Sequence, residues 1–471
     1  MRFKRVLTGL LAVLLIILQA GMPVLAEEGE EKTPEQIQAE EEAKKQERYN
    51  AVPESNTWTN WPAGPNVYAD SAIVMDMNSK AVLYSKQSQE QLFPASITKF
   101  LTVLVALENA ELTDRVTFSE ESIAILNYDD AQIGMKPGEE LSLEDALYAV
   151  LLASANEVSY AVAESIGRKM GGGYDTFIQA MNDRAAELGC TNSHWVNPNG
   201  LHDDNHYTTV RDMALITAAL YQRPEFFKFM QTLEYRIGPT NLTAEERIFQ
   251  QNHRMMWPEN FYFYEYCTGG KTGFTDQAQT TLITTADNGT LQLVAVTMHD
   301  FGTDVYVDTR AMLDYGFQNF SKALLKDNDH SEDIKSFIDP QAYVLLPAGA
   351  DFSQLMREIV ITGGDRAEAT YTLNGQVVGI AGIIVSDAYL EKIRPAHEDV
   401  ANTADPGALE TAAASDQDTL TTAVSIGKTI MVVIIILVLA IIALILLIQR
   451  RRMNARQERG RRRRNRNRNR N

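Results

Sequence analysis

The sequence predicts an α/β fold of the α+β type, in which helices cover an antiparallel sheet, followed by a small all-β domain and a C-terminal transmembrane helix. Three observations lead to this prediction. Pairs of apolar strands stand at both ends of a helix-rich middle, a strictly alternating stretch follows at 367–373, and residues 429–448 carry no charge. A sheet buries its apolar face most readily against helices, and twenty uncharged residues are long enough to cross a bilayer.

Local patterns place the individual elements of the first domain, 58–325. Pro94 suits the first turn of a helix, and the run behind it is apolar on nearly every face. Ser142 opens a capping-box pattern, and Asn288-Gly289 forms a hairpin turn. We expect strands at 72–76, 81–84, 280–286 and 291–298, and helices at 94–107, 143–152, 157–166, 174–188, 210–221 and 310–320. The small β domain follows at 334–397, where residues 367–373 and 377–385 flank the turn Asn374-Gly375.

The N-terminal residues 1–26 have the features of a secretory signal peptide. A basic start precedes the apolar run 6–18, and the segment ends in small residues at Ala26. Residues 27–57 are rich in Glu, Gln and Lys, so we interpret them as an acidic, solvated spacer that can form helix transiently, with stable order beginning near Trp58.

The C-terminal residues predict a membrane anchor. Residues 398–428 read as a flexible linker, 429–448 as the transmembrane helix and 449–471 as an Arg-rich cytoplasmic tail. The tail carries twelve arginines and one glutamate. Positive charge of this kind stays in the cytoplasm, so the domains before the span are expected on the extracytoplasmic face of a bacterial cell membrane.

Composition excludes some classes of function. The formal net charge of −19 is concentrated in residues 27–448, because both ends of the chain are basic. A general basic surface for nucleic acid is therefore excluded there. The two cysteines, Cys190 and Cys267, are too few for a disulfide framework, and the sequence leaves open whether they pair.

Ser96 and Lys99 form the first candidate catalytic pair. Three residues apart at the start of a helix, they share one face. A desolvated lysine can lose its proton near neutral pH and then take the proton of a serine, which is otherwise a weak nucleophile. A Ser-x-x-Lys pattern alone is common by chance, so the pair requires partners.

Two further motifs supply these partners. Ser154-Ala155-Asn156 lies at a predicted break between helices, and Lys271-Thr272-Gly273 lies beside a predicted strand. Together with Ser96 and Lys99 they form a known signature of penicillin-binding proteins and class A β-lactamases. Any one motif could be a helix cap, a loop or a turn, whereas all three in this order favour a catalytic site.

Residues 67–320 resemble the serine-type D-Ala-D-Ala carboxypeptidases, the low-molecular-mass penicillin-binding proteins of peptidase family S11. The similar blocks are 94–99, 154–157, 197–201 and 271–275, and the β domain 334–397 matches by position and strand pattern. The resemblance implies a β-lactamase/transpeptidase-like fold. It also implies a peptidoglycan stem peptide ending in D-Ala-D-Ala as substrate, β-lactams as inhibitors, and no cofactor or metal.

The residue roles carried over from this family are as follows. Ser96 is the nucleophile, Lys99 its base, and Ser154 relays a proton to the leaving D-Ala. Asn156, Lys271, Thr272 and Gly273 would bind the substrate, and the backbone N–H groups of Ser96 and Phe274 would form the oxyanion hole. Glu157 and Gly270 depart from the usual residues of the family, as does a full membrane span.

Several alternatives remain open at this point. A D,D-endopeptidase or a β-lactamase would share the three motifs, and a non-catalytic wall-binding protein could share the fold. A zinc-dependent carboxypeptidase is the mechanistic rival, since His202, Asp203, Asp204 and His206 could hold a metal. The turn residues just before them favour a loop instead.

Overall fold

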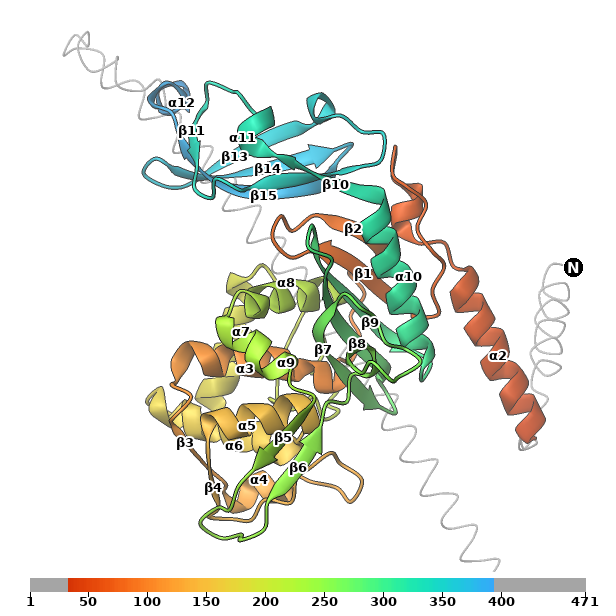
Figure 1. Cartoon of the computed structure of the whole chain (residues 1–471), viewed down its shortest axis with the longest axis vertical. Coiled ribbons are helices and arrows are strands. Elements are labelled where there is room, and N and C mark those ends of the chain that lie inside the picture. The colour runs from red at the N-terminus through yellow and green to blue at the C-terminus, as the bar shows by residue number, and fades with distance from the viewer. Residues whose placement is uncertain (1–32, 394–471) are drawn as a thin grey trace, which may run out of the picture. The chain divides into compact units, whose positions relative to one another are not determined.

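The computed structural model describes residues 33–393 (Figure 1). The predicted signal peptide, linker, transmembrane helix and Arg-rich tail lie outside this part of the chain. Within residues 33–393, no helix is both long enough and apolar enough to cross a membrane.

A five-stranded antiparallel sheet forms the centre of the first domain, in the order β2-β1-β9-β8-β7. The strands are β1 (Ser71–Asp76), β2 (Val82–Lys86), β7 (Cys267–Thr275), β8 (Gln279–Asp287) and β9 (Gln292–Asp300). Both predicted hairpins are confirmed. β1, the first of these strands in the sequence, pairs with β9, the last in the sequence, and Val74 lies opposite Ala295. The N-terminal and C-terminal parts of the domain therefore meet in the middle of the sheet. β7 lies at the sheet edge.

The two faces of the sheet belong to two different cores. Alternate residues of β1 show this: Ile73 and Met75 pack into the helical core, whereas Ala72 and Val74 pack into the core that contains α10 (Asp304–Asn319). Successive side chains of a strand point to opposite faces, which explains why every residue of β1 is buried.

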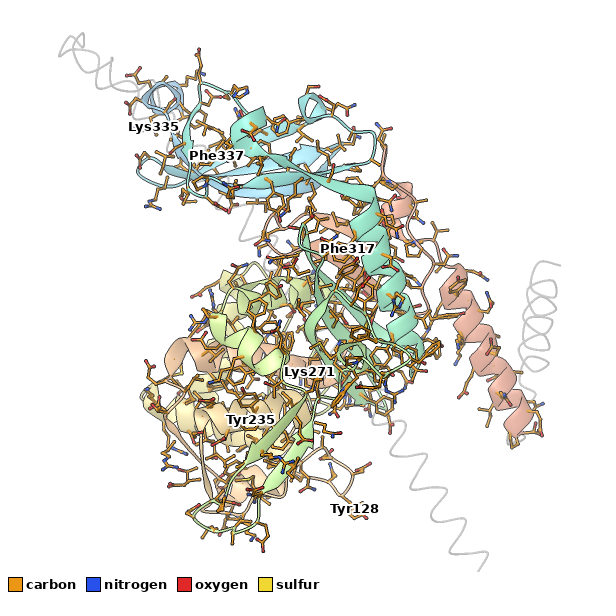
Figure 2. All side chains as sticks on the ribbon, in the orientation of Figure 1. Tyr128, Tyr235, Lys271, Phe317, Lys335 and Phe337 are labelled. Atoms are coloured by element: carbon orange, nitrogen blue, oxygen red, sulfur yellow. The ribbon has the colours of Figure 1, made fainter. Side chains whose placement is uncertain are left out.

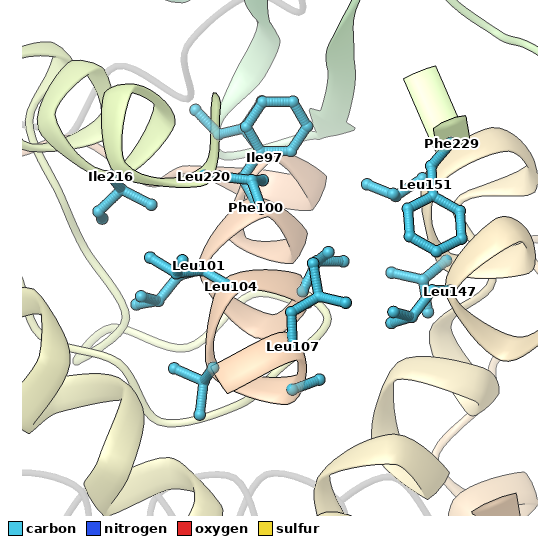
Figure 3. Packing of buried hydrophobic residues seen from close by; sticks show 14 of the residues in the cluster. Ile97, Phe100, Leu101, Leu104, Leu107, Leu147, Leu151, Ile216, Leu220 and Phe229 are labelled. Atoms are coloured by element: carbon cyan, nitrogen blue, oxygen red, sulfur yellow. The ribbon is translucent and has the colours of Figure 1, made fainter. Parts of the chain in front are cut away.

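Helices of the middle segment cover the first face. They are α3 (Lys99–Asn109), α5 (Leu143–Tyr148), α6 (Asn156–Lys169), α7 (Tyr174–Glu187), α8 (Val210–Tyr221) and α9 (Pro224–Met230), with the short α4 (Glu120–Ala124). α3 is buried from Lys99 to Leu107, and Figure 3 shows its apolar side chains between Leu147 on one side and Ile216 on the other. The segment 100–107, which is apolar on nearly every face, therefore forms a buried central helix, as expected.

Two short strand pairs lie among the helices. β3 (Arg115–Thr117) pairs with β4 (Glu140–Ser142), and β5 (Glu234–Ile237) pairs with β6 (Arg247–Gln250). The capping box is confirmed in part, because the Ser142 side chain accepts a hydrogen bond from the Asp145 N–H at the start of α5.

The small β domain consists of β11 (Ile334–Phe337), β13 (Met356–Gly363), β14 (Arg366–Leu373) and β15 (Gln376–Val385), in the order β11-β15-β14-β13. β10 (Phe320–Leu324) leads directly out of α10 and pairs with β12 (Tyr343–Pro347). α11 (Leu325–Asn328) and α12 (Asp387–Ile393) complete this part. The Tyr343 hydroxyl donates to the buried Asp76 carboxylate at 2.7 Å, which joins this domain to the β1–β2 hairpin.

The structure differs from the spacer expected at 27–57. Residues Pro34–Asn50 form helix α2, so order begins well before Trp58. None of its residues is buried, in agreement with its polar composition, but its last turn is held by charge. Arg48 lies 2.7 Å from Asp70 and donates to the His299 carbonyl at 2.9 Å. Composition alone does not reveal such long-range ion pairs.

Candidate active site

Lys99 lies at the centre of a buried hydrogen-bond network. Its Nζ atom lies 2.8 Å from Ser96 Oγ and donates to Asn156 Oδ1 at 2.7 Å and to the Asn199 carbonyl at 2.6 Å. The side chain is fully buried, and burial, together with the nearby Lys271, holds the pKa of Lys99 well below the usual range for lysine. An amine with a lowered pKa can act as a base near neutral pH.

The backbone before α3 presents Ser96 to solvent. Ala95–Thr98 form a 3-10 turn, and Ala95 adopts φ 49°, a left-handed conformation that costs energy for a residue with a Cβ. Gly200 packs against this turn so closely that an added Cβ would lie 1.9 Å from the Ala95 carbonyl oxygen. Strain held by close packing of this kind is typical of functional sites.

Ser154 occupies the break that the sequence predicted. α5 continues into a π-helical turn at Ala149–Ala153, and Ser154 then adopts φ 59° before α6 begins at Asn156. This sharp reversal directs Ser154 and Asn156 to one place. π-turns are frequent at functional sites.

Lys271 on β7 reaches Ser154 from the opposite side. Its Nζ atom donates to Ser154 Oγ at 3.0 Å and to the Thr272 carbonyl at 2.7 Å. Burial lowers the pKa of Lys271 to about 7, because burial in protein disfavours a charged amine. Figure 2 shows Lys271 between the sheet and the helical part of the domain.

The three motifs meet in one cavity of about 910 Å³. Its lining includes Ser96, Ser154, Asn156, Thr272, Gly273 and Phe274. Lys99 and Lys271 lie behind this surface, both almost inaccessible to solvent. All residues that the sequence singled out for the site are therefore brought together.

β7 approaches Ser96 closely because residue 273 is glycine. A Cβ added at Gly273 would lie 2.9 Å from Ser96 N and 2.4 Å from Thr281 Oγ1. Thr281 in turn donates to the Pro94 carbonyl at 2.9 Å and so ties the sheet to the turn that carries Ser96. The Phe274 side chain is 62% exposed at the cavity.

Sequence reasoning gave no role to several residues of the site. The Asn199 carbonyl accepts from Lys99, although only the turn chemistry of 197–201 was evident. Glu157 is fully buried and accepts from the Ile133 N–H at 2.7 Å, which fixes the loop beside Asn156. Arg254 and Tyr306 also line the cavity, and no local pattern in the sequence points to them.

The histidine-rich segment after the turn is part of the fold. His206 is buried, with Nε2 2.9 Å from Thr98 Oγ1 and Nδ1 accepting from the Val196 N–H at 3.2 Å. His202 stacks edge-on against Phe93 at the mouth of the site. Among residues 33–393, no group of three or more His, Cys, Asp or Glu side chains is arranged to hold a metal ion. Cys190 and Cys267 are free thiols.

Comparison with known proteins agrees with this geometry. The family model of D-alanyl-D-alanine carboxypeptidases, peptidase S11, matches residues 58–302. D-alanyl-D-alanine carboxypeptidase DacF of Bacillus subtilis is 30% identical over 304 residues, which cover 62% of this chain and 73% of DacF. DacA of Haemophilus influenzae is 30% identical over 268 residues, covering 54% of this chain and 63% of that protein, which is less than two thirds of its length.

Among solved structures, penicillin-binding protein 5 of Haemophilus influenzae shares the fold. The TM-score is 0.54 at 24% identity, and the match covers 69% of this chain and 98% of the other. With more than half of the sequence matched by the family model and the three motifs assembled around one cavity, this chain belongs to the D-alanyl-D-alanine carboxypeptidases of peptidase family S11, a family of serine peptidases.

Proposed function

We propose that Ser96 removes the terminal D-Ala from peptidoglycan stem peptides through a covalent acyl-enzyme. The observation that carries this proposal is the 2.8 Å contact between Lys99 Nζ and Ser96 Oγ at the floor of a cavity that also contains Ser154. A nucleophile and a base within hydrogen-bonding distance, oriented by a third group, are the minimum for such chemistry.

Acylation begins with proton transfer from Ser96 to the neutral amine of Lys99. Asn156 and the Asn199 carbonyl orient the amine. Ser96 Oγ then forms a bond to the carbonyl carbon of the penultimate D-Ala. The resulting oxyanion would be stabilised by the backbone N–H groups of Ser96 and Phe274, at roughly 3 kcal/mol for each donor. The close passage of Gly273 past Ser96 N supports this placement.

Collapse of the tetrahedral intermediate breaks the peptide bond, and the leaving nitrogen requires a proton. Ser154 can relay it, since its hydroxyl accepts from Lys271 and faces the same cavity. Lys271 and Thr272 would hold the terminal carboxylate of the substrate, and Asn156 its backbone. Water then hydrolyses the ester and restores Ser96. A β-lactam would acylate the same oxygen.

We also propose that the chain is anchored in a bacterial cell membrane with its catalytic domain on the extracytoplasmic face. The uncharged run 429–448, the Arg-rich tail 449–471 and the secretory pattern of 1–26 support this placement. The substrate is found on the same side of the membrane.

The decisive experiment measures the intact mass of the purified chain after incubation with benzylpenicillin, with Ser96→Ala as control. A penicilloyl adduct on the wild type alone, together with D-Ala release from a soluble peptide ending in D-Ala-D-Ala, is the expected result. Rapid loss of penicillin without a stable adduct would indicate a β-lactamase. No adduct with penicillin intact would refute the acyl-enzyme, and cleavage of cross-linked peptides in preference to D-Ala release would indicate an endopeptidase.

A further inference from the structure

An exposed group of aromatic side chains lies on the segment between β6 and β7. Phe261 is 90% exposed, Phe263 37% and Tyr266 36%. We call these three residues the aromatic platform. Large aromatic side chains seldom remain in water together unless the surface binds something.

Phe261 links the platform to the wall of the active-site cavity. Phe261 packs edge-on against Tyr262, with ring centroids 5.2 Å apart, and Tyr262 stacks on Tyr306 at 5.0 Å. Tyr306 lines the cavity, where the Arg254 guanidinium lies 5.9 Å from its ring. A ladder of rings therefore leads from the cavity to the surface.

The segment that carries the platform is fixed at its base. Tyr264 is 3% exposed, and its hydroxyl donates to Asp314 at 2.8 Å. Its ring lies under the Arg310 guanidinium at 4.9 Å, and Tyr266 contacts Phe317, labelled in Figure 2, at 5.6 Å. Tyr264 and Tyr266 are thus held in place without a ligand, which lowers the entropy cost of binding one at Tyr266.

We propose that the aromatic platform binds the glycan strand of peptidoglycan, an inference that rests on the proposed function of the adjacent cavity. The stem peptide is attached to an amino sugar, so a glycan must lie near the mouth of the cavity whenever a polymeric substrate is bound. The apolar C–H faces of pyranose rings pack on aromatic rings, and this contact requires no charge. Glu259 and Glu265 lie beside the platform, as do Arg254 and Arg310, so its surroundings have no excess of positive charge that would favour anionic lipid as its partner.

The test separates glycan binding from catalysis. The full chain in detergent, carrying Ser96→Ala, is sedimented with purified glycan strands from which the stem peptides have been removed enzymatically. The double substitution Phe261→Ala and Tyr266→Ala should weaken co-sedimentation roughly three- to tenfold. D-Ala release from a soluble peptide by the same double variant with Ser96 intact should be unchanged. If Ser96→Ala with and without the double substitution co-sedimented equally with the glycan strands, the proposal would be overturned.

Two control variants sharpen this test. Phe261→Tyr keeps an aromatic ring and should keep glycan binding, whereas Phe261→Leu keeps an apolar side chain and should lose it. Met356→Ala removes a 73% exposed apolar side chain from β13 and should have no effect.

A photo-crosslinking phenylalanine analogue at position 261 identifies the occupant directly. Capture of glycan supports the proposal, whereas capture of lipid or of a second copy of the chain contradicts it. If the wild type released no D-Ala from the soluble peptide, the proposed function would be refuted, but the measurement of glycan binding would still stand.

Discussion

Lys99 Nζ lies 2.8 Å from Ser96 Oγ although the two residues differ in solvent access, Lys99 being buried and Ser96 partly exposed. Lys99 is fully buried, whereas Ser96 opens to the cavity. The 3-10 turn before α3 makes this possible, because it directs Ser96 outward while Lys99 begins the buried helix. The base is therefore desolvated and the nucleophile remains accessible.

Replacing the base while keeping its charge tests this arrangement. Lys99→Arg should lower the rate of acylation by benzylpenicillin on the order of 10³-fold, since a guanidinium cannot give up its proton near neutral pH. Stopped-flow or quenched-flow mass spectrometry measures the rate. Lys169→Arg is the matched control, because Lys169 pairs with Asp114 at the surface and should leave acylation unchanged. Acylation of Lys99→Arg at the wild-type rate would assign the base to another group.

We expect the burial of Lys271 to lower the free energy of unfolding at neutral pH, although the residue is needed for function. Its pKa of about 7 is far below that of a lysine in the unfolded chain. Between pH 7 and about 10.5 the unfolded state binds a proton that the folded state does not, so stability is lost as the pH falls through this window. Lys271→Met removes this penalty.

The expected result is a rise in the free energy of unfolding of Lys271→Met, on the order of 3 kcal/mol at pH 7 and much less near pH 10. Urea unfolding at both pH values measures it. Acylation by a β-lactam should fall at least 10²-fold in the same variant, because the carboxylate of the β-lactam no longer has a lysine amine to bind. A variant less stable than the wild type at pH 7 would mean that the hydrogen bonds of Lys271 to Ser154 and Thr272 outweigh its burial.

Much of the fold was accessible from local patterns. α8 begins and ends where the sequence predicted, at Val210 and Tyr221, because an apolar periodicity is bounded there by the Thr209 cap. The break at Ser154 was also visible, because it interrupts two helical patterns. The identity of the site followed from motif order, since each motif alone has an ordinary structural explanation.

Other features depend on residues far apart in the sequence and could not be predicted. The Asn199 carbonyl orients Lys99 from a distance of 100 residues, and a backbone atom leaves no trace in residue type. The docking of α2 depends on contacts of Arg48 with Asp70, which directly precedes β1, and with His299, near the end of β9. Polar composition predicts solvent exposure, as α2 confirms, but it does not predict where single charges find partners.

Gly273 should tolerate no side chain. In Gly273→Ala the new methyl would meet Ser96 N and Thr281 Oγ1 at distances that real Cβ atoms do not adopt, so β7 or the Ser96 turn must move. We expect a loss of about 1–3 kcal/mol in stability and a loss of acylation of roughly 10²-fold from displacement of the reacting groups. Gly173→Ala is the control, since nothing lies within 4 Å of its added Cβ. Wild-type acylation in Gly273→Ala would show that the close approach of β7 to Ser96 is not required.

Arg48 should determine whether α2 stays docked. Arg48→Met keeps the apolar stem but removes the ion pair with Asp70, the bond to the His299 carbonyl and the contact with the Phe301 ring at 4.6 Å. We expect a stability loss of roughly 1–2 kcal/mol, because these groups are only partly exposed, and faster proteolysis within residues 34–50. Limited trypsin or glutamyl-endopeptidase digestion followed by mass mapping measures the second effect.

Glu41→Ala, an exposed position on the same helix, should change neither quantity. Besides the contact of the Tyr49 ring with Tyr68, the docking of α2 depends on ion pairs of Arg48 and Lys45. High salt should therefore accelerate its cleavage in the wild type toward the rate of Arg48→Met. Cleavage of α2 that is equally slow in the variant and insensitive to salt would show that the helix is held by contacts other than those of Arg48.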